Sequence, residues 1–285
     1  MPELPNTPVG EWVDEIVDWL TDNMGWLFDL ISSVLDFLID NLESLLTWPD
    51  PLILIAIFGA FAWWIRSAAF GAFTVLALAL VESMRHWDAT MSSLSLVLVA
   101  TLVAVLIGVP VGIATSRNAT VSSIVRPILD LMQTMPAFVY LVPAIVFFGL
   151  GKVPGVVATI IFAMPPSVRL TELGIRQVDA EVVEAGHAFG SPPSQILTKI
   201  QLPLALPTIM AGINQVIMLA LSMVVIAGMV GAGGIGAVVF RGITRLDVGL
   251  GVEGGLSVVI LAIFLDRTTA AIGDRASRYR DKAAA

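Results

Sequence analysis

The chain has 285 residues, of which 57% are hydrophobic and only 13% are charged, and its mean hydropathy is +0.90. This composition excludes a soluble globular protein and indicates several membrane-spanning helices. The absence of cysteine and the presence of only two histidines exclude a disulfide framework, thiol chemistry and a histidine-built metal centre, so we expect no metal site.

The net charge of −8 comes from one segment of the chain. Residues 1–50 contain eleven acidic residues and no Lys or Arg, whereas the remainder contains 15 basic and 12 acidic residues. A chain with this distribution has no extended basic surface, which argues against a nucleic-acid partner. Residues 1–10 lack a basic region followed by an apolar core, so we expect no cleavable signal peptide.

Residues 1–50 are also amphipathic. Apolar side chains recur at helical spacing from Trp12 and Ile16 to Leu45, and acidic residues such as Asp36 gather on the other side. This pattern predicts one or two helices that lie on the membrane surface with their Trp side chains at headgroup depth. A partly disordered tail is the alternative. We expect this acidic segment to lie outside the cytoplasm.

Seven apolar segments follow, and we interpret them as about seven transmembrane helices. A span needs about 20 apolar residues to cross a hydrocarbon core of ~30 Å. The first two segments are shorter than this, and they form either two short accessory spans within residues 51–90 or a re-entrant hairpin. The other five define a core transmembrane region, residues 91–272, which is followed by a tail of residues 273–285. The segments are residues 51–65, 67–82, 91–115, 124–150, 153–170, 204–230 and 254–272.

The basic residues predict the orientation of these spans, because Lys and Arg are enriched in cytoplasmic loops. If the polar loop of residues 179–203 is cytoplasmic and the spans alternate, eleven basic residues lie inside and four lie outside. This assignment places the N-terminus outside and the C-terminus in the cytoplasm. Those inside are Arg66, Arg117, Arg126, Arg169, Arg176, Lys199, Arg267, Arg275, Arg278, Arg280 and Lys282, and those outside are Arg85, Lys152, Arg241 and Arg245.

No catalytic constellation is evident. The acidic residues beyond the first fifty, Glu172 among them, fall mostly at span ends or in loops, and none is clearly placed at mid-membrane, which argues against a proton-driven transporter. Gly231, Gly233 and Gly236 satisfy the spacing G-x-G-x-x-G, but the long apolar segment before them leaves no room for the βαβ unit of a dinucleotide site. We expect these glycines to permit a bend or close helix approach at the outer end of a span.

The polar loop, residues 179–203, separates two apolar segments and has the pattern of two short helices that meet at Gly190. Ser191 is predicted to cap the second helix, which Pro203 and Pro207 are expected to break or bend. The first helix is expected to present an apolar face of small residues. This face comprises Val182, Val183, Ala185, Gly186 and Phe189.

This loop resembles the cytoplasmic EAA loop of permease subunits in binding-protein-dependent ABC importers. The family pattern is Glu-Ala-Ala, three residues, Gly, nine residues, Ile, one residue and Leu-Pro, and Gly186 replaces the second Ala. The resemblance implies a coupling helix that docks in a groove on an ATPase subunit, whereas an ordinary interfacial hairpin is the alternative. The matching residues are Glu184, Ala185, Gly190, Ile200, Leu202 and Pro203.

Further stretches between residues 90 and 270 narrow this resemblance. They include RPILDLMQTMPAFVYLVPAIVFFGLG from Arg126 and LPTIMAGINQVIMLALSMVVIAGMVGAGGIG from Leu206, and they look like the permeases of glycine betaine/proline betaine importers. Relatives that carry choline, carnitine or ectoine are similar enough to leave the substrate open.

The resemblance implies an all-α integral membrane protein of the plasma or inner membrane, with the type I ABC importer permease fold. It also implies a second permease copy, two cytoplasmic ATPase subunits, an extracytoplasmic binding protein and surrounding lipid as partners. No Walker A sequence is present, so ATP and Mg²⁺ are used by the partner and this chain binds no cofactor. The alternative is an ATPase-independent osmolyte channel or a secondary transporter.

A quaternary ammonium substrate carries a fixed charge and is attracted to aromatic faces. Residues of this kind flank the proline that interrupts the segment 124–150, and others lie in the penultimate span. We expect them to line the substrate pathway, with core packing as the alternative. They are Met135, Pro136, Phe138, Tyr140, Ser222 and Met223.

Overall fold

The computed structural model describes residues 9–284, with side chains from Gly10 to Arg275. The expectations for residues 1–8 and for the side chains beyond Arg275 therefore lie outside the described part. Every regular element within this part is a helix. In chain order they are α1 (Val9–Thr47), α2 (Pro51–Ile65), α3 (Ala68–Ser83), α4 (Trp87–Arg117), α5 (Ala119–Thr134), the 3₁₀ helix η1 (Ala137–Tyr140), α6 (Leu141–Phe148), α7 (Lys152–Ala163), α8 (Pro165–Arg176), α9 (Ala180–Ala188), α10 (Pro193–Gln195), the π-helix η2 (Ile196–Gln201), α11 (Leu202–Ala227), the 3₁₀ helix η3 (Gly228–Val230), α12 (Gly234–Thr244) and α13 (Val248–Ala284).

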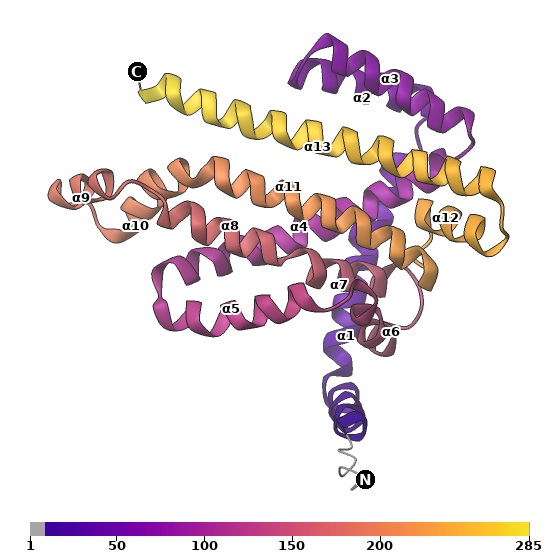
Figure 1. Cartoon of the computed structure of the whole chain (residues 1–285), viewed down its shortest axis with the longest axis horizontal. Coiled ribbons are helices and arrows are strands. Elements are labelled where there is room, and N and C mark those ends of the chain that lie inside the picture. The colour runs from indigo at the N-terminus through magenta and orange to yellow at the C-terminus, as the bar shows by residue number, and fades with distance from the viewer. Residues whose placement is uncertain (1–8, 285) are drawn as a thin grey trace, which may run out of the picture.

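Long apolar helices form the body of the molecule, where α4, α8, α11 and α13 run roughly alongside one another (Figure 1). Four helical stretches of the described chain are long and apolar enough to cross a membrane, and two bent helix pairs raise this number to six. The straight stretches are Trp87–Arg117, Lys152–Arg176, Pro193–Val230 and Val248–Arg275. The helical membrane fold is thus confirmed, with four to six spans by length where about seven apolar segments were expected.

The first two apolar segments form the helical hairpin α2–α3, which lies beside α13 (Figure 1). At ~1.5 Å per residue these helices measure only about 22–24 Å, which is short for a ~30 Å hydrocarbon core. Phe58 and Phe70 contact the ring of Phe264 on α13, with centroid distances of 5.5 and 6.4 Å. The guanidinium group of Arg275 lies 4.7 Å from the ring of Trp64 and donates to its carbonyl oxygen, which further holds the hairpin against α13.

Residues 124–150 were expected to form a single span, but the helix is interrupted and the chain changes direction within this segment. The chain bends by 111° between α5 and α6. Met135 ends α5 in an extended conformation with ψ 135°, because the ring of Pro136 disfavours a helical conformation in the residue before it. The bend brings α6 back against α7 and leaves α5 to run beside α8 (Figure 1).

Small residues allow the core helices to approach closely. A Cβ atom on Gly112 of α4 would lie 2.6 Å from the carbonyl oxygen of Val168 on α8, and one on Gly174 of α8 would lie 3.2 Å from the carbonyl oxygen of Ala205 on α11. Membrane helices gain little from hydrophobic exclusion and depend on such packing. These contacts hold α8 between α4 and α11.

The glycine run after α11 confirms the expected bend and close approach. Gly231, Gly233 and Gly234 all have positive φ, which turns the chain back into α12, a helix that the sequence analysis did not predict. A Cβ atom on Gly228 would lie 2.8 Å from the Cα atom of Gly236, so the two segments touch through their backbones. This turn packs α12 against the end of α11 and α13.

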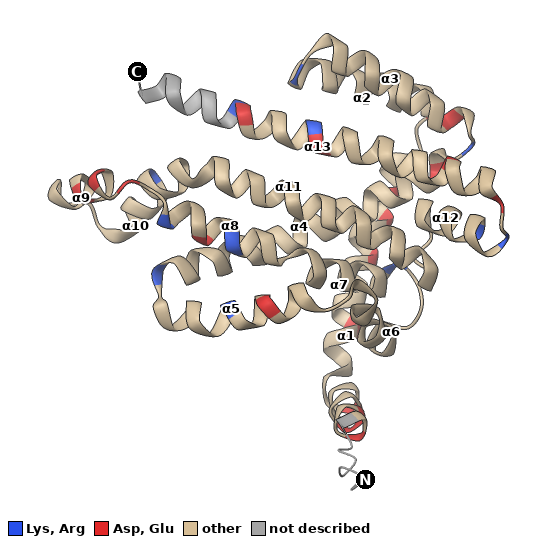
Figure 2. Cartoon of the chain, in the orientation of Figure 1, with Lys and Arg blue, Asp and Glu red and all other residues tan. Residues whose placement is uncertain are grey.

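Helix α1 crosses the body of the molecule near the end that carries α12, far from α9 (Figure 1). The amphipathic helix expected near the N-terminus is present as one helix of 39 residues. Lys152 at the start of α7 pairs with Asp40 at 3.2 Å and Glu43 at 2.8 Å, and Phe28 stacks on Phe147 with a centroid distance of 4.5 Å. Acidic residues run along this helix (Figure 2).

Candidate functional site

The polar loop forms α9, a glycine turn and a helical arm. Asp179 caps α9, because its Oδ1 atom accepts a hydrogen bond of 2.9 Å from the backbone N–H of Glu181. Gly190 has φ +76°, and the backbone N–H of Ser191 donates to the carbonyl oxygen of Gly186 at 3.1 Å. This pattern ends a helix with a glycine in the left-handed conformation, as the sequence indicates. The loop therefore contains two helical parts that meet at Gly190.

One local prediction for the second part is wrong, and another is wrong only as to a break in the helix. Pro192, and not Ser191, precedes the first helical residue, because the ring of Pro193 disfavours a helical conformation in the residue before it and Pro192 is extended, with ψ 154°. Pro203 and Pro207, which were expected to break or bend the helix, do not break it, since residues Pro193–Val230 form one continuous stretch. The helix widens into the π-helix η2 before Pro203, and the N–H of Leu202 bonds to the carbonyl oxygen of Leu197. Such π-helical turns are rare, and this one lies directly before a proline, which has no N–H to donate within a helix.

Gly186 faces the arm and is the only residue of α9 that is buried in the chain. A Cβ atom at this position would lie 2.8 Å from Cδ1 of Ile200 and 3.5 Å from Cγ1 of Ile196. The structure thus brings Gly186, which replaces the second Ala of the EAA pattern, against Ile200, which is one of the matching residues. Ile200, Leu202 and Pro203 are half-buried on the arm.

The other side of α9 faces away from the rest of the chain. Glu184 and Ala185 are exposed, Val182 is 42% exposed and Phe189 is 89% exposed. The expected apolar face is therefore divided, because Gly186 packs inward while Val182 and Phe189 point outward. We call the exposed residues Val182, Glu184, Ala185 and Phe189 the α9 face. This face has the size and mixed polarity of a helix that inserts into a groove on another protein.

The arm is anchored in the bundle by a small apolar cluster. Leu197 of η2 packs with Ile175 at the end of α8 and with Ala205 and Ile209 of α11, and all four side chains are buried. The arm that contacts α9 is therefore packed against the ends of both α8 and α11, which are core helices.

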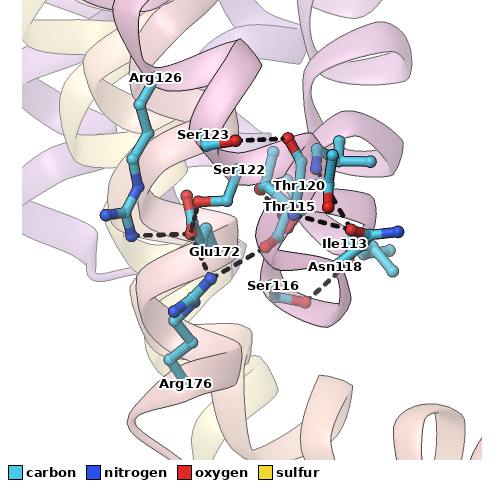
Figure 3. Close-up of polar contacts among 12 residues, drawn as sticks. Ile113, Thr115, Ser116, Asn118, Thr120, Ser122, Ser123, Arg126, Glu172 and Arg176 are labelled. Carbon is cyan, nitrogen blue, oxygen red and sulfur yellow. Dashed lines mark hydrogen bonds and ion pairs between the residues drawn. The ribbon is translucent and has the colours of Figure 1, made fainter.

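A buried carboxylate links three helices next to this loop (Figure 3). Glu172 of α8, whose side chain is 6% exposed, accepts hydrogen bonds from Ser122 at 3.0 Å and from Arg126 at 2.9 Å, both on α5. Arg176 pairs with the same carboxylate at 2.9 Å and donates to the carbonyl oxygen of Thr115 on α4 at 3.0 Å. The sequence analysis did not identify this buried acid, because burial depends on helices that are distant along the chain.

The expected pathway residues fall into two groups. Met135, Pro136 and Phe138 lie at or near the surface at the bend between α5 and η1, and Ser222 is exposed on α11. Met223 has no exposed surface, and Tyr140 is 6% exposed and packs against Phe162 with a centroid distance of 6.0 Å. Met135 and Tyr140 border an apolar groove of about 840 Å³ between α1 and the η1–α6 segment.

Within the part of the chain that the structure describes, no three His, Asp or Glu side chains lie close enough to hold a metal ion. The arrangement connects an exposed helix, α9, through its arm to the long apolar helices α8 and α11.

Comparison with known proteins gives consistent matches along the chain. Residues 104–278 match the family described as "binding-protein-dependent transport system inner membrane component". The chain is 51% identical to the glycine betaine transport system permease protein OpuAB of Bacillus subtilis, with 94% of this chain and 95% of that protein covered. It is 49% identical to the glycine betaine/proline betaine transport system permease protein ProW of Escherichia coli, with 96% and 77% covered.

Two other matches extend this result. The chain is 48% identical to the glycine betaine/carnitine transport permease protein GbuB of Listeria monocytogenes, over 97% of this chain and 99% of that protein. A solved structure of the MetNI methionine ABC transporter in an inward-facing conformation matches with a TM-score of 0.58 and 25% identity, over 66% of this chain and 92% of that chain.

Proposed function

This chain belongs to the family of binding-protein-dependent transport system inner membrane components, and from that premise we propose that it is the permease subunit of an ATP-driven importer for glycine betaine or proline betaine. The observation that carries the proposal is the 51% identity to a glycine betaine permease over 94% of this chain. The matching relatives are permease proteins of transport systems, which argues against an ATPase-independent channel.

The α9 face is proposed to bind the ATPase subunit. Its support is geometric, because Val182 and Phe189 are exposed on a helix that is fixed to two core helices through the buried Leu197. Closure of an ATPase dimer would displace α9 and rock the core helices, which exposes a central cavity alternately to each side. ATP and Mg²⁺ would bind to the ATPase subunits, and two copies of this chain would form the pathway.

The proposed orientation places α9 in the cytoplasm and α1 outside. In support, α9 and α12 lie at opposite ends of the bundle, and α1 crosses near the α12 end (Figure 1). Acidic residues line α1, and the basic residues Arg117 and Arg176 end helices on the α9 side. An extracytoplasmic binding protein would then meet the end of the bundle that carries α1 and α12.

Co-purification and reconstitution test this function directly. We expect the full chain to purify with a stoichiometric ATPase subunit. In vesicles supplied with the binding protein, it should take up glycine betaine only in the presence of hydrolysable ATP. A panel of proline betaine, choline, carnitine and ectoine then defines the substrate range. Uptake by this chain alone, without the ATPase or ATP, would contradict the proposal.

Phe138 is proposed to contact the trimethylammonium group during passage. Its ring is 51% exposed beside Pro136, and a contact between a cation and a ring contributes about 0.5–1 kcal/mol at an exposed site and about 2 kcal/mol when desolvated. We expect Phe138→Ala to lower the rate of uptake about tenfold at unchanged abundance, whereas Phe138→Tyr should retain most of it. Initial rates of radiolabelled uptake measure the effect, and equal rates for the Ala variant and the original chain would remove Phe138 from the pathway.

A further inference from the structure

Glu172 is the only Asp or Glu that is buried within the described side chains. An ionised carboxylate in such a position is stabilised only when charged and polar partners surround it. Glu172 has three such partners, Ser122, Arg126 and Arg176, and they belong to two different helices, α5 and α8 (Figure 3). Through the bond of Arg176 to Thr115 the same cluster reaches α4.

Helix α5 depends on this cluster for its position. Only two of its 16 residues are buried, namely Ser122 and Leu129, and Ser122 is the residue that donates to Glu172. A second ion pair between Asp130 of α5 and Arg169 of α8 is more exposed, with side-chain exposures of 65% and 40%. Exposed pairs hold weakly because water competes with them. The buried carboxylate is therefore the main polar attachment of α5 to α8.

The two ends of this attachment have different roles. Helix α8 ends at Arg176, close to Asp179 where the polar loop begins, and its end shares an apolar cluster with the arm of that loop. Helix α5 ends at Thr134, directly before Met135 and Pro136 at the bend that precedes Phe138. Glu172 thus lies between the segment that is proposed to bind the ATPase and the segment that is proposed to line the pathway.

We propose that Glu172 is a positioning residue of the transport cycle, which couples α5 to α8 so that displacement of the polar loop also moves the pathway segment. The inference rests on the proposed function and adds to it the residue that transmits the movement. If the Glu172 side chain were neutral, its ion pairs would be lost. Helix α5 has few other buried contacts, so it would then no longer follow α8 when α8 moves. ATP hydrolysis would then continue without productive passage of substrate.

Glu172→Gln tests this role in the reconstituted complex with the ATPase and the binding protein. The amide keeps the size of the side chain, and Arg126 and Arg176 are 56% and 43% exposed, so water can hydrate both guanidinium groups and the variant should fold. We expect the number of substrate molecules transported per ATP hydrolysed to fall at least about fivefold, with ATP hydrolysis nearly unchanged. Glu172→Asp should recover part of this ratio. Glu253→Gln, which removes the pair with His86 at the other end of the molecule, is the matched control and should leave the ratio unchanged.

A distance measurement distinguishes transmission from a purely structural role. The chain contains no cysteine, so spin labels can be placed on the exposed positions Ile128 of α5 and Gln177 at the end of α8. In the original chain we expect the same distance between labels in the nucleotide-free and ATP-trapped complexes, because the helices move as one body. In Glu172→Gln the two states should differ.

Three results would overturn the inference: an unchanged transport ratio, a proportional loss of transport and hydrolysis together with lower thermal stability, or equal label distances in both states of the variant. Failure of the proposed function is distinguishable, because the original chain would then show no ATP-dependent uptake at all.

Discussion

Gly186→Leu is expected to reduce ATP-driven uptake to about a tenth or less of the original rate while the protein still inserts into the membrane. A side chain at this position meets Ile200 and Ile196 at once, since even its Cβ atom would lie 2.8 Å from Cδ1 of Ile200. A leucine would force α9 away from the arm and misplace the α9 face relative to the ATPase. Uptake into vesicles and the amount of co-purified ATPase measure the effect.

Gly186→Ala is the matched control for this prediction. The contacting atom is the far end of a flexible Ile200 side chain, which can rotate away from a single methyl group. We therefore expect nearly full uptake, in agreement with the Ala that the EAA pattern has at this position. Full uptake by the Leu variant, with the ATPase bound, would show that the seating of α9 on its arm has no role in coupling.

Gly228→Ala is expected to destabilise the protein by about 1–3 kcal/mol, which is large for the addition of one methyl group. The new Cβ atom would lie 2.5 Å from the backbone nitrogen of Ala237 and 2.8 Å from the Cα atom of Gly236. Backbone atoms cannot rotate aside as a side chain can, so the turn between α11 and α12 must open. Thermal unfolding in detergent, followed by fluorescence, should show a melting temperature lower by several degrees.

Gly255→Ala controls for the change of residue type. At this helical position of α13 a Cβ atom would have no neighbour within 4 Å, and alanine favours a helix over glycine by about 1 kcal/mol. We expect an unchanged or slightly higher melting temperature. If Gly228→Ala unfolds at the same temperature as the original chain, the turn is more deformable than its backbone contacts indicate.

These two glycines, Gly186 and Gly228, illustrate how the architecture serves transport. Gly228 keeps the turn between α11 and α12 compact, whereas Gly186 seats the exposed helix α9 on an arm that continues into α11. The arm reaches the bundle through Leu197, and Glu172 ties α5 to α8 next to it. A movement imposed on α9 therefore has a continuous path into the core helices.

Several features were accessible from the sequence because they depend on local pattern. The apolar segments predicted helices that the structure confirms, Trp12 and Leu45 do belong to one amphipathic helix, and Gly190 does adopt the left-handed conformation that ends α9. The spacing from Glu184 to Pro203 was sufficient to indicate the importer family, which the comparisons confirm. The assignment of individual residues to coupling and to the pathway stays a prediction.

Other features were missed because they depend on competing local rules. Ser191 and Pro192 both suit a helix start, but Pro193 holds Pro192 in an extended conformation and so moves the helix start past both. Pro203 commonly ends a helix, yet a π-turn allows it to continue. Pro136 could kink a span gently or redirect it, and the packing of α6 on α7 accompanies a bend of 111°.

The sequence by itself determined the helical membrane class, the family and the position of the loop that is proposed to meet the ATPase, because run length, residue spacing and turn chemistry are properties of neighbouring residues. Only the tertiary structure decided that Gly186 touches Ile200 and that Glu172 is buried among Ser122, Arg126 and Arg176. Both contacts join separate helices, and burial and charge pairing arise only when those helices pack against one another.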